Sequence, residues 1–435
     1  MRISTGRVGR GDPAWESGSQ AELPLRTLFS PHLPPEVHMP GHIVMLNIPA
    51  QGHMRPALAV TEELVRRGHR VSFLTTEGFA PAVRATGATA LTYDTLVTEV
   101  LAPGRYQTPS PDMLAWSAVQ FFEESVKLVT LARQIFADDV PDLLYYDMIV
   151  SPAGRALGQL WGRPAVQSTP SMASNDHYSQ VMAVTEMSGV SSEHPAVVEL
   201  LGRAEKFAAD LGLDATTEFL VDWRADRSVV YAPREFQPAG DTFGEETTFV
   251  GSCHSTAYGK GAWEDPEDGL PLVVLSMGTL YNHQPEFFRT CVRAFDGRPW
   301  HAVITIGHGT DPGEQGPLPP NVEVHQWIPQ LAALRKAAVF VTGAGLGSLM
   351  DALYTGTPPV MVPQVPETRV LSHRAVELGL GTLLHPAEVT ADTLLAAVER
   401  TAADEGMRER VRRMPELMKR AGGPVRAAEA LEALL

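Results

Sequence analysis

The sequence predicts an α/β protein with two doubly wound parallel sheets, each covered by helices on both faces. Short apolar runs alternate with amphipathic stretches from residue 42 onward, and this alternation pauses in the polar segment 252–270 and restarts at Leu272. Runs that are apolar on both faces and separated by helices are typical of parallel strands buried between helices. Right-handed crossovers would make each half Rossmann-like.

The first half, residues 39–251, begins with five strands that alternate with helices. Its predicted strands are 42–48, 71–75, 89–93, 143–147 and 165–169, followed by 229–231 and 248–250. Its predicted helices are 56–68, 78–86, 113–137 and 151–161. Segment 171–225 is rich in Met, Ser, Glu and Ala, and we expect it to form helices and loops over the first sheet.

The second half, residues 271–435, repeats the pattern after the predicted linker 252–270. Its predicted strands are 272–278, 300–307, 322–325, 339–342 and 359–362, and its helices are 285–295, 331–337, 347–355, 367–378, 390–402 and 405–434. Two such domains that face each other bring the carboxyl ends of their strands to one cleft, where open α/β sheets bind ligands.

Amino-acid composition argues against several classes of function. The 435 residues carry 35 basic and 51 acidic side chains, a net charge of −16, which disfavours nucleic-acid binding. Two cysteines make no disulfide framework, so we expect a cytoplasmic protein. No apolar run reaches the roughly 20 residues that a membrane span needs. Residues 1–38 contain Gly, Ser, Pro and scattered charge without periodicity, and predict a disordered extension.

A histidine and an aspartate follow two strands of the first half. His53 lies in the turn between the first strand and its helix, and Asp147 ends the strand 143–147. A parallel sheet can place both at the same edge, where the carboxylate would orient the imidazole as a general base. The alternative is structural, with His53 filling a loop and Asp147 capping a helix.

A glycine-rich turn in the second half is the other candidate. The stretch V-T-G-A-G-L-G-S follows an apolar strand and opens a helix, so its bare amides could hold a phosphate. The spacing is not the complete dinucleotide fingerprint, and a tight turn or a nicotinamide- or flavin-binding loop remain alternatives. Trp327 could stack on a flat base or belong to the core. Histidines and cysteines show no zinc spacing, so no metal is expected.

In combination, these segments resemble the macrolide-type glycosyltransferases of antibiotic biosynthesis, which use nucleotide sugars and have two facing Rossmann-like domains (GT-B type). The resemblance covers residue 42 to the C-terminus. It depends on the strand that ends at Asp147 and on the motifs I-P-A-Q-G-H-M-R-P-A-L, L-V-R-R-G-H-R-V, N-V-E-V-H-Q-W-I-P-Q-L, V-T-G-A-G-L-G-S-L-M-D-A-L and V-P-Q-V-P-E. It also implies that the final helix crosses back to the N-terminal domain.

The resemblance assigns roles to the residues of this sequence. His53 would deprotonate an acceptor hydroxyl, with Asp147 orienting it, and the acceptor would lie under segment 171–225. The nucleotide, UDP or TDP, would lie in the C-terminal domain. It would leave the sugar in a displacement that inverts the anomeric carbon, and no metal would be needed. The donor-binding residues would be Trp327 and Gln330 at the base, Asp351 at the ribose, Ser276, Gly345, Gly347 and Ser348 at the diphosphate, and Glu367 at the sugar.

Three positions depart from the family pattern. Gly343 stands where a diphosphate-binding histidine is usual, Thr368 where glutamine follows the sugar-facing acid, and Arg55 where asparagine precedes the proline of the first loop. Two alternatives follow from the altered donor loop. One is an enzyme of this fold that has lost sugar-nucleotide use and catalyses cyclisation, elimination or isomerisation of a natural-product intermediate. The other is a non-catalytic binding partner, which would not need His53 and Asp147.

Overall fold

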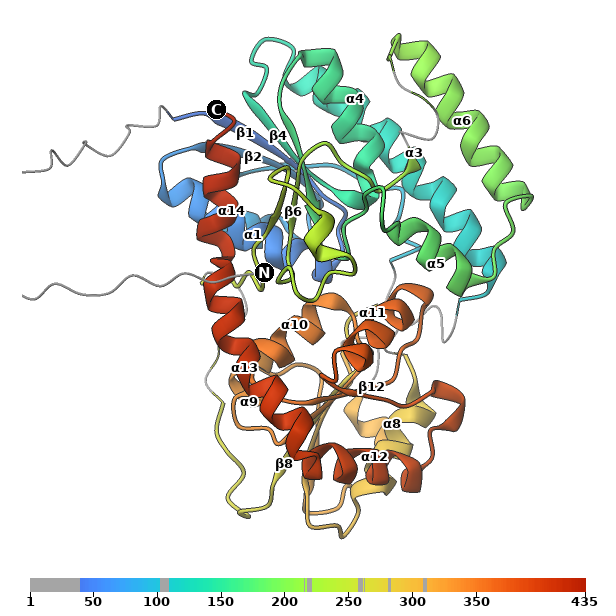
Figure 1. Ribbon diagram of the computed structural model, residues 1–435, viewed down its shortest axis with the longest axis vertical. Coiled ribbons are helices and arrows are strands. Elements are labelled where there is room, and N and C mark those ends of the chain that lie inside the picture. Colours follow the sequence, from blue (N-terminus) through green and yellow to red (C-terminus); the bar gives the residue numbers. More distant parts are fainter. Residues whose placement is uncertain are drawn as a thin grey trace, which may run out of the picture. The chain divides into compact units, whose positions relative to one another are not determined.

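The computed structural model describes residues 40–101, 109–214, 216, 221–256, 261, 263–280, 283–307 and 311–435 (Figure 1). The expected disordered extension, residues 1–38, lies outside these ranges, as do residues 257–260 and 262 of the predicted linker. Residues 39–435 form one compact unit that contains both predicted sheets.

The first sheet has seven parallel strands in the order β3-β2-β1-β4-β5-β6-β7. Its strands are β1 (His42–Leu46), β2 (Arg70–Thr75), β3 (Thr89–Thr92), β4 (Leu143–Asp147), β5 (Ala165–Thr169), β6 (Ser228–Val230) and β7 (Thr247–Phe249). The helices of this half are α1 (Gln51–Arg66), α2 (Ala80–Ala85), α3 (Pro111–Ile135), α4 (Ser151–Trp161), α5 (Gln180–Ser188) and α6 (Pro195–Leu211), with short turns η1 (Met148–Val150) and η2 (Gly240–Thr242).

The second sheet has six parallel strands in the order β10-β9-β8-β11-β12-β13. Its strands are β8 (Leu272–Ser276), β9 (His301–Thr305), β10 (Val322–His325), β11 (Val339–Thr342), β12 (Pro359–Met361) and β13 (Thr382–Leu383). Its helices are α8 (Pro285–Phe295), α9 (Gln330–Leu334), α10 (Leu346–Thr355), α11 (Pro366–Glu377), α12 (Ala391–Ala403), α13 (Glu405–Ala421) and α14 (Gly423–Glu432), with η3 (Pro312–Gln315) and η4 (Pro386–Glu388).

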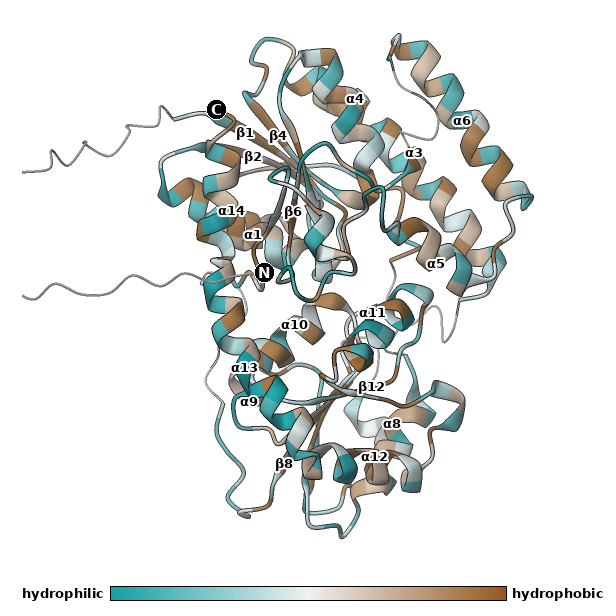
Figure 2. Cartoon of the chain, viewed as in Figure 1, coloured by the Kyte–Doolittle hydropathy of each residue, from teal (hydrophilic) through white to brown (hydrophobic). Residues whose placement is uncertain are grey.

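Both faces of each sheet are buried, as the apolar runs predict. Ile43 and Met45 of β1 pack with α1 and α14, whereas Val44 and Leu46 pack with α3 and α4. The central strands β1, β4, β8 and β11 are accordingly mostly hydrophobic, while α13 turns a polar face outward (Figure 2). A further apolar cluster joins the two halves and includes Phe236 and Phe249 from the first and Met350 from α10.

Two helix boundaries differ from the prediction. Helix α1 begins at Gln51 rather than at Pro56, so His53 lies in its first turn and not in a loop. The proline suggested a helix start because it is favoured at the first helical position, but here it is tolerated inside the helix, near its beginning. The predicted helix 405–434 is broken at Gly422 and Gly423, whose φ values of 90° and 56° suit glycine.

The break allows α14 to pack on the first sheet, as the resemblance implied. Residues from Gly423 onward, which the sequence assigned to the second domain, therefore belong to the first core.

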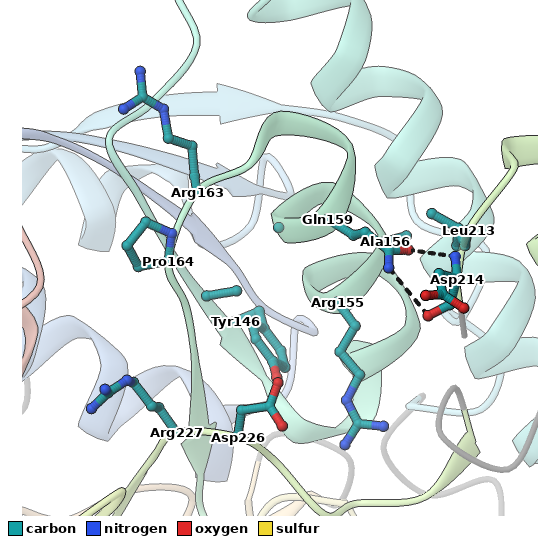
Figure 3. Close-up of a pocket in the computed structure, with 12 residues that line it drawn as sticks. Tyr146, Arg155, Ala156, Gln159, Arg163, Pro164, Leu213, Asp214, Asp226 and Arg227 are labelled. Atoms are coloured by element: carbon teal, nitrogen blue, oxygen red, sulfur yellow. Dashed lines mark hydrogen bonds between the residues drawn. The ribbon is translucent and has the colours of Figure 1, made fainter. Parts of the chain in front are cut away.

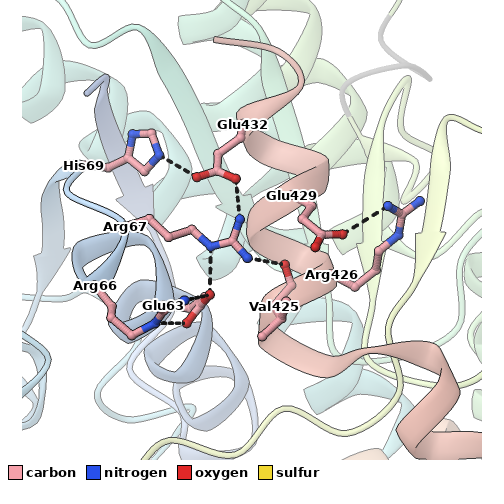
Figure 4. Close-up of polar contacts among 8 residues, drawn as sticks. All are labelled: Glu63, Arg66, Arg67, His69, Val425, Arg426, Glu429 and Glu432. Atoms are coloured by element: carbon pink, nitrogen blue, oxygen red, sulfur yellow. Dashed lines mark hydrogen bonds and ion pairs between the residues drawn. The ribbon is translucent and has the colours of Figure 1, made fainter. Parts of the chain in front are cut away.

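Glu432 accepts hydrogen bonds from Arg67 at 2.5 Å and from His69 Nε2 at 3.0 Å (Figure 4). Nδ1 of His69 accepts from the Gly41 amide at 3.1 Å, which leaves the proton on Nε2. Burial opposes ionisation of Glu432, but these partners outweigh it and lower its pKa.

We expect Glu432→Gln to destabilise the protein by about 1–3 kcal/mol at pH 7, because Arg67 and His69 lose a charged partner in a buried contact. The pKa of Glu432 is lower in the folded than in the unfolded protein, so its ionised form stabilises the fold at pH values above the unfolded pKa. This stabilisation is lost as the pH falls through the folded pKa. The difference between wild type and variant in urea unfolding should therefore shrink below about pH 4.5. Glu429→Gln, on the exposed side of α14, is the control; equal losses in both variants would contradict this role.

Candidate functional site

The two predicted catalytic residues meet at the switch point of the first sheet. Strand order reverses between β1 and β4, and α1 follows β1 while η1 follows β4. His53 lies in the first turn of α1 and Asp147 is the last residue of β4, so both side chains emerge at the carboxyl edge of the sheet. The prediction that they lie at the same edge is therefore confirmed.

The pair forms one short hydrogen bond. His53 Nδ1 lies 2.7 Å from Asp147 Oδ2, and the Asp147 side chain is fully buried whereas that of His53 is 21% exposed. The other carboxylate oxygen, Oδ1, accepts from the Ile149 amide at 2.9 Å, which fixes the carboxylate plane. Because an ionised carboxylate only accepts, the neutral imidazole carries its proton on Nδ1 and its lone pair on Nε2. This is the tautomer that a general base requires.

Electrostatics raise the pKa of His53 above its usual 6.5. Burial alone would lower it, but the charge and hydrogen bond of Asp147, together with the charge of Glu367, more than offset burial. Glu367 lies in the first turn of α11, in the second half of the chain. The predicted catalytic base and the predicted sugar-facing carboxylate are therefore close enough to interact electrostatically, although they are separated by more than 300 residues.

The glycine-rich turn lies at the switch point of the second sheet, between β8 and β11. Gly345 is the N-cap of α10 and has no side chain to cap its amides, and no acidic residue lies in the first helical turn. Side chains added at Gly345 or Gly347 would meet open space. Ala344 adopts a left-handed φ of 62°, which is unfavourable for a residue with a Cβ. The amino end of α10 is therefore an open, uncapped site that favours an anion.

Gly343 lies directly beneath this turn. It does not have a positive φ, so backbone strain does not require glycine there. A Cβ at this position would instead approach the Met277 carbonyl oxygen at 3.0 Å. The lack of space above the end of β8, and not the backbone conformation, therefore disfavours a side chain at position 343.

Asp351, the predicted ribose-binding acid, is buried on α10 and has several partners. Its Oδ1 accepts from His254 Nε2 at 2.9 Å, and its Oδ2 accepts from Gln330 Nε2 at 2.9 Å. Arg55 of α1 approaches Oδ2 at 3.4 Å. Burial opposes ionisation of Asp351, but Arg55, His254 and Gln330 lower its pKa. The contact with His254, which comes from the predicted linker, was not predicted from the sequence.

The remaining predicted donor residues come from β8, from the segment after β10 and from α10. Ser276 ends β8 beside β11 and is buried, with its hydroxyl accepting from the Gly278 amide at 3.4 Å. Trp327 is 53% exposed, as a stacking platform would be. Ser348 lies in the first turn of α10. The Thr368 hydroxyl bonds to the backbone of Val365 at the start of α11.

Tyr178 is a further polar residue near these groups. It precedes α5, which packs against α11, and its hydroxyl donates to Gln180 at 2.5 Å. Burial raises the pKa of Tyr178 to about 12, with Arg374 opposing the shift and Glu367 adding to it. Segment 171–225 therefore brings a neutral phenol close to Glu367, which sequence reasoning did not anticipate because the segment lacks a recognisable pattern.

A cavity of about 500 Å³ lies elsewhere in the first half (Figure 3). It includes residues that precede β5 and β6, at the opposite strand ends from Asp147, and it is lined by Tyr146, Arg155, Arg163, Asp214, Asp226 and Arg227, among others.

Within the described part of the chain, no three His, Cys, Asp or Glu side chains cluster as metal ligands would. No described helix has the length and apolarity to cross a membrane.

Comparison with known proteins gives consistent matches. Residues 296–434 match the family described as erythromycin biosynthesis protein CIII-like, C-terminal domain. The chain is 36% identical to the demethyllactenocin mycarosyltransferase of Streptomyces fradiae, over 91% of this chain and 87% of that protein. It is also 36% identical to the oleandomycin glycosyltransferase of Streptomyces antibioticus, over 91% of each. The crystal structure of the calicheamicin glycosyltransferase CalG4 superposes with a TM-score of 0.81 at 36% identity, covering 91% of this chain and 98% of that one.

Proposed function

The chain belongs to the family of antibiotic-biosynthesis glycosyltransferases, and we propose that it moves a sugar from a nucleoside diphosphate sugar to a hydroxyl of a polyketide- or macrolide-like acceptor, with inversion at the anomeric carbon. The observation that carries this proposal is the pair His53–Asp147, held 2.7 Å apart at one switch point, with the uncapped amino end of α10 at the other.

The proposed chemistry needs one base and one site for the leaving group. Nε2 of His53 removes the proton of the acceptor hydroxyl while its oxygen attacks the anomeric carbon. The bond from that carbon to the diphosphate oxygen breaks, and the nucleoside diphosphate leaves with the electron pair. Asp147 stabilises the imidazolium that forms. Attack from the face opposite to the leaving group inverts the configuration.

The donor is proposed to lie over the second sheet. The amides of α10 and the hydroxyls of Ser276 and Ser348 would receive the diphosphate, with Gly345 and Gly347 allowing close approach. Asp351 would bind the ribose, Trp327 and Gln330 the base, and Glu367 the sugar hydroxyls. We propose UDP- or TDP-sugars as donors. Relatives named for macrolide antibiotics support an apolar acceptor beside segment 171–225.

The proposal extends to the cellular setting. Both cysteines, Cys253 and Cys291, are unpaired and buried, which suits a reducing compartment, and we propose that the reaction takes place in the cytoplasm.

Binding and turnover test the function directly. Calorimetry with UDP and TDP, each with and without an attached sugar, is expected to give micromolar affinity for at least one nucleotide. Turnover of a macrolide acceptor should then require that sugar nucleotide. Conversion of the acceptor that proceeds equally well without any nucleotide would instead support the acid–base alternative and exclude sugar transfer.

We expect transfer to be independent of a divalent metal. Helix amides and polar side chains would offset the diphosphate charge in place of a cation. Dialysis against EDTA should therefore leave the transfer rate unchanged, and added Mg²⁺ or Mn²⁺ should not raise it. A rate that collapses with EDTA and returns with one metal would contradict this expectation.

Gly343→His probes the altered donor loop, with Gly343→Ala as its control. Both variants place a Cβ at 3.0 Å from the Met277 carbonyl oxygen, so alanine controls for the steric cost of the Cβ. Only histidine adds a diphosphate partner, and a charge-assisted hydrogen bond is worth about 1.5–3 kcal/mol. Relative to Gly343→Ala, the histidine variant should therefore bind the donor about 10- to 100-fold more tightly. Equal donor affinities in the two variants would show that the diphosphate does not lie above residue 343.

A further inference from the structure

Arg55 is a charged residue of the site that the proposed mechanism leaves without a role. It lies two positions after His53 on α1, and with Gly52 and Pro56 it forms the helix face that borders a small cavity. Across this cavity lie Leu346, Gly347 and Asp351 of α10. The Arg55 side chain is 35% exposed, so it is neither free in solvent nor fixed in the core.

The surroundings of this guanidinium favour an anionic ligand. The amino ends of α1 and α10 both contribute residues to the cavity, neither N-cap has a side-chain hydrogen bond, and neither first turn contains an acidic residue. Two helix amino ends and one cation therefore border the same cavity. The negative group there is Asp351, which sits four residues beyond Gly347.

Asp351 has two hydrogen-bond partners besides Arg55. Its two oxygens accept hydrogen bonds at 2.9 Å from His254 and Gln330, whereas Arg55 stays at 3.4 Å, an ion-pair distance rather than a good hydrogen bond. Arg55 contributes to the lowered pKa of the buried Asp351, but the two hydrogen bonds of Asp351 do not involve Arg55. A guanidinium also binds phosphate strongly through paired N–H donors. The guanidinium can therefore turn to a phosphate without leaving Asp351 unpaired.

We propose that Arg55 is a donor-binding residue that contacts the diphosphate of the nucleotide sugar and supplies the cation that the side-chain-free position Gly343 does not. This inference rests on the proposed function. It places a diphosphate contact on the same helix turn as the base His53. One rigid helix would then contact the leaving group and also accept the proton of the acceptor hydroxyl. Arg55 would stabilise the negative charge that grows on the diphosphate as the sugar leaves.

The test is calorimetric binding of UDP, TDP, the corresponding monophosphates and the nucleosides to wild type, Arg55→Ala and Arg55→Gln. The control is Arg66→Ala, which removes the same charge from an exposed position on α1. Both Arg55 variants should bind the preferred diphosphate about 10- to 100-fold more weakly. Affinity for the nucleoside should change by less than about threefold, and Arg66→Ala should bind like wild type. Arg55→Gln keeps the length of the side chain in case alanine disturbs the helix.

Three results would overturn the proposal. Unchanged diphosphate affinity in both Arg55 variants would remove the contact, and an equal loss for nucleoside and diphosphate would place Arg55 at the ribose or at Asp351. In either case wild-type sugar transfer would still stand, so only the role of Arg55 would fail. If wild type bound no nucleotide of any kind, both this inference and the proposed function would fall.

Discussion

Replacing His53 by alanine is expected to lower kcat for sugar transfer by on the order of 10³-fold, the largest effect of any single change considered. The variant loses the lone pair on Nε2, and Asp147 is fully buried behind it and cannot reach the acceptor in its place. Because His53 is not one of the proposed donor-binding residues, donor affinity should stay close to that of wild type.

The comparison variant is His373→Ala, which removes an exposed histidine of α11. It should retain full turnover, and both variants should melt near the wild-type temperature. Imidazole added to the buffer should restore part of the activity of His53→Ala, because the lost side chain leaves a partly exposed space. Full turnover in His53→Ala would remove the base from the mechanism, whatever the reaction.

The pH dependence of wild type follows from the same pair. A base must be neutral to accept a proton, and the pKa of His53 is raised above 6.5 by Asp147 and Glu367 despite burial. The acidic limb of the kcat/KM profile is therefore expected above pH 6.5, with activity falling as pH drops through the raised value. Glu367→Gln should move this limb to lower pH, because it removes one of the charges that raise it.

Much of the fold could be predicted because the strands are apolar on both faces and the helices between them are periodic. The catalytic pair could be predicted for a related reason, since residues that end parallel strands next to a switch point must meet at one edge. The start of α1 was placed too late, because Pro56 resembles a first helical residue. The predicted helix 405–434 was not divided at Gly422 and Gly423, although Gly-Gly followed by Pro424 is a helix-breaking signal.

The contacts of Asp351 show where sequence reasoning stops. His254 comes from a segment without periodicity, Gln330 from the start of α9, and Arg55 from the other half of the chain. Nothing in the spacing of these residues relates them to one another. Their association depends on how the two sheets pack through the apolar cluster around Phe236 and Met350, which is a property of the tertiary structure.

Asp147→Asn is expected to lower kcat by roughly 10²- to 10³-fold, less than His53→Ala but through a defined change of tautomer. The Ile149 amide donates to Oδ1, so the asparagine carbonyl should keep that bond and its NH₂ group should take the place of Oδ2. That NH₂ would donate to His53 Nδ1. The neutral imidazole would then carry its proton on Nε2, where it faces the acceptor and cannot accept another.

The pH profile and a second variant distinguish this change of tautomer from a general loss of structure at the site. Without the Asp147 charge the pKa of His53 should fall, so the acidic limb should move to lower pH even though the plateau is lower. Asp147→Ala also removes the charge but imposes no tautomer, so it should keep more activity than Asp147→Asn at equal thermal stability. If asparagine proved the milder of the two, the orientation of the carboxylate would not control the tautomer of His53. An acidic limb that stayed in place in both variants would show that Asp147 is not the charge that sets the basicity of His53.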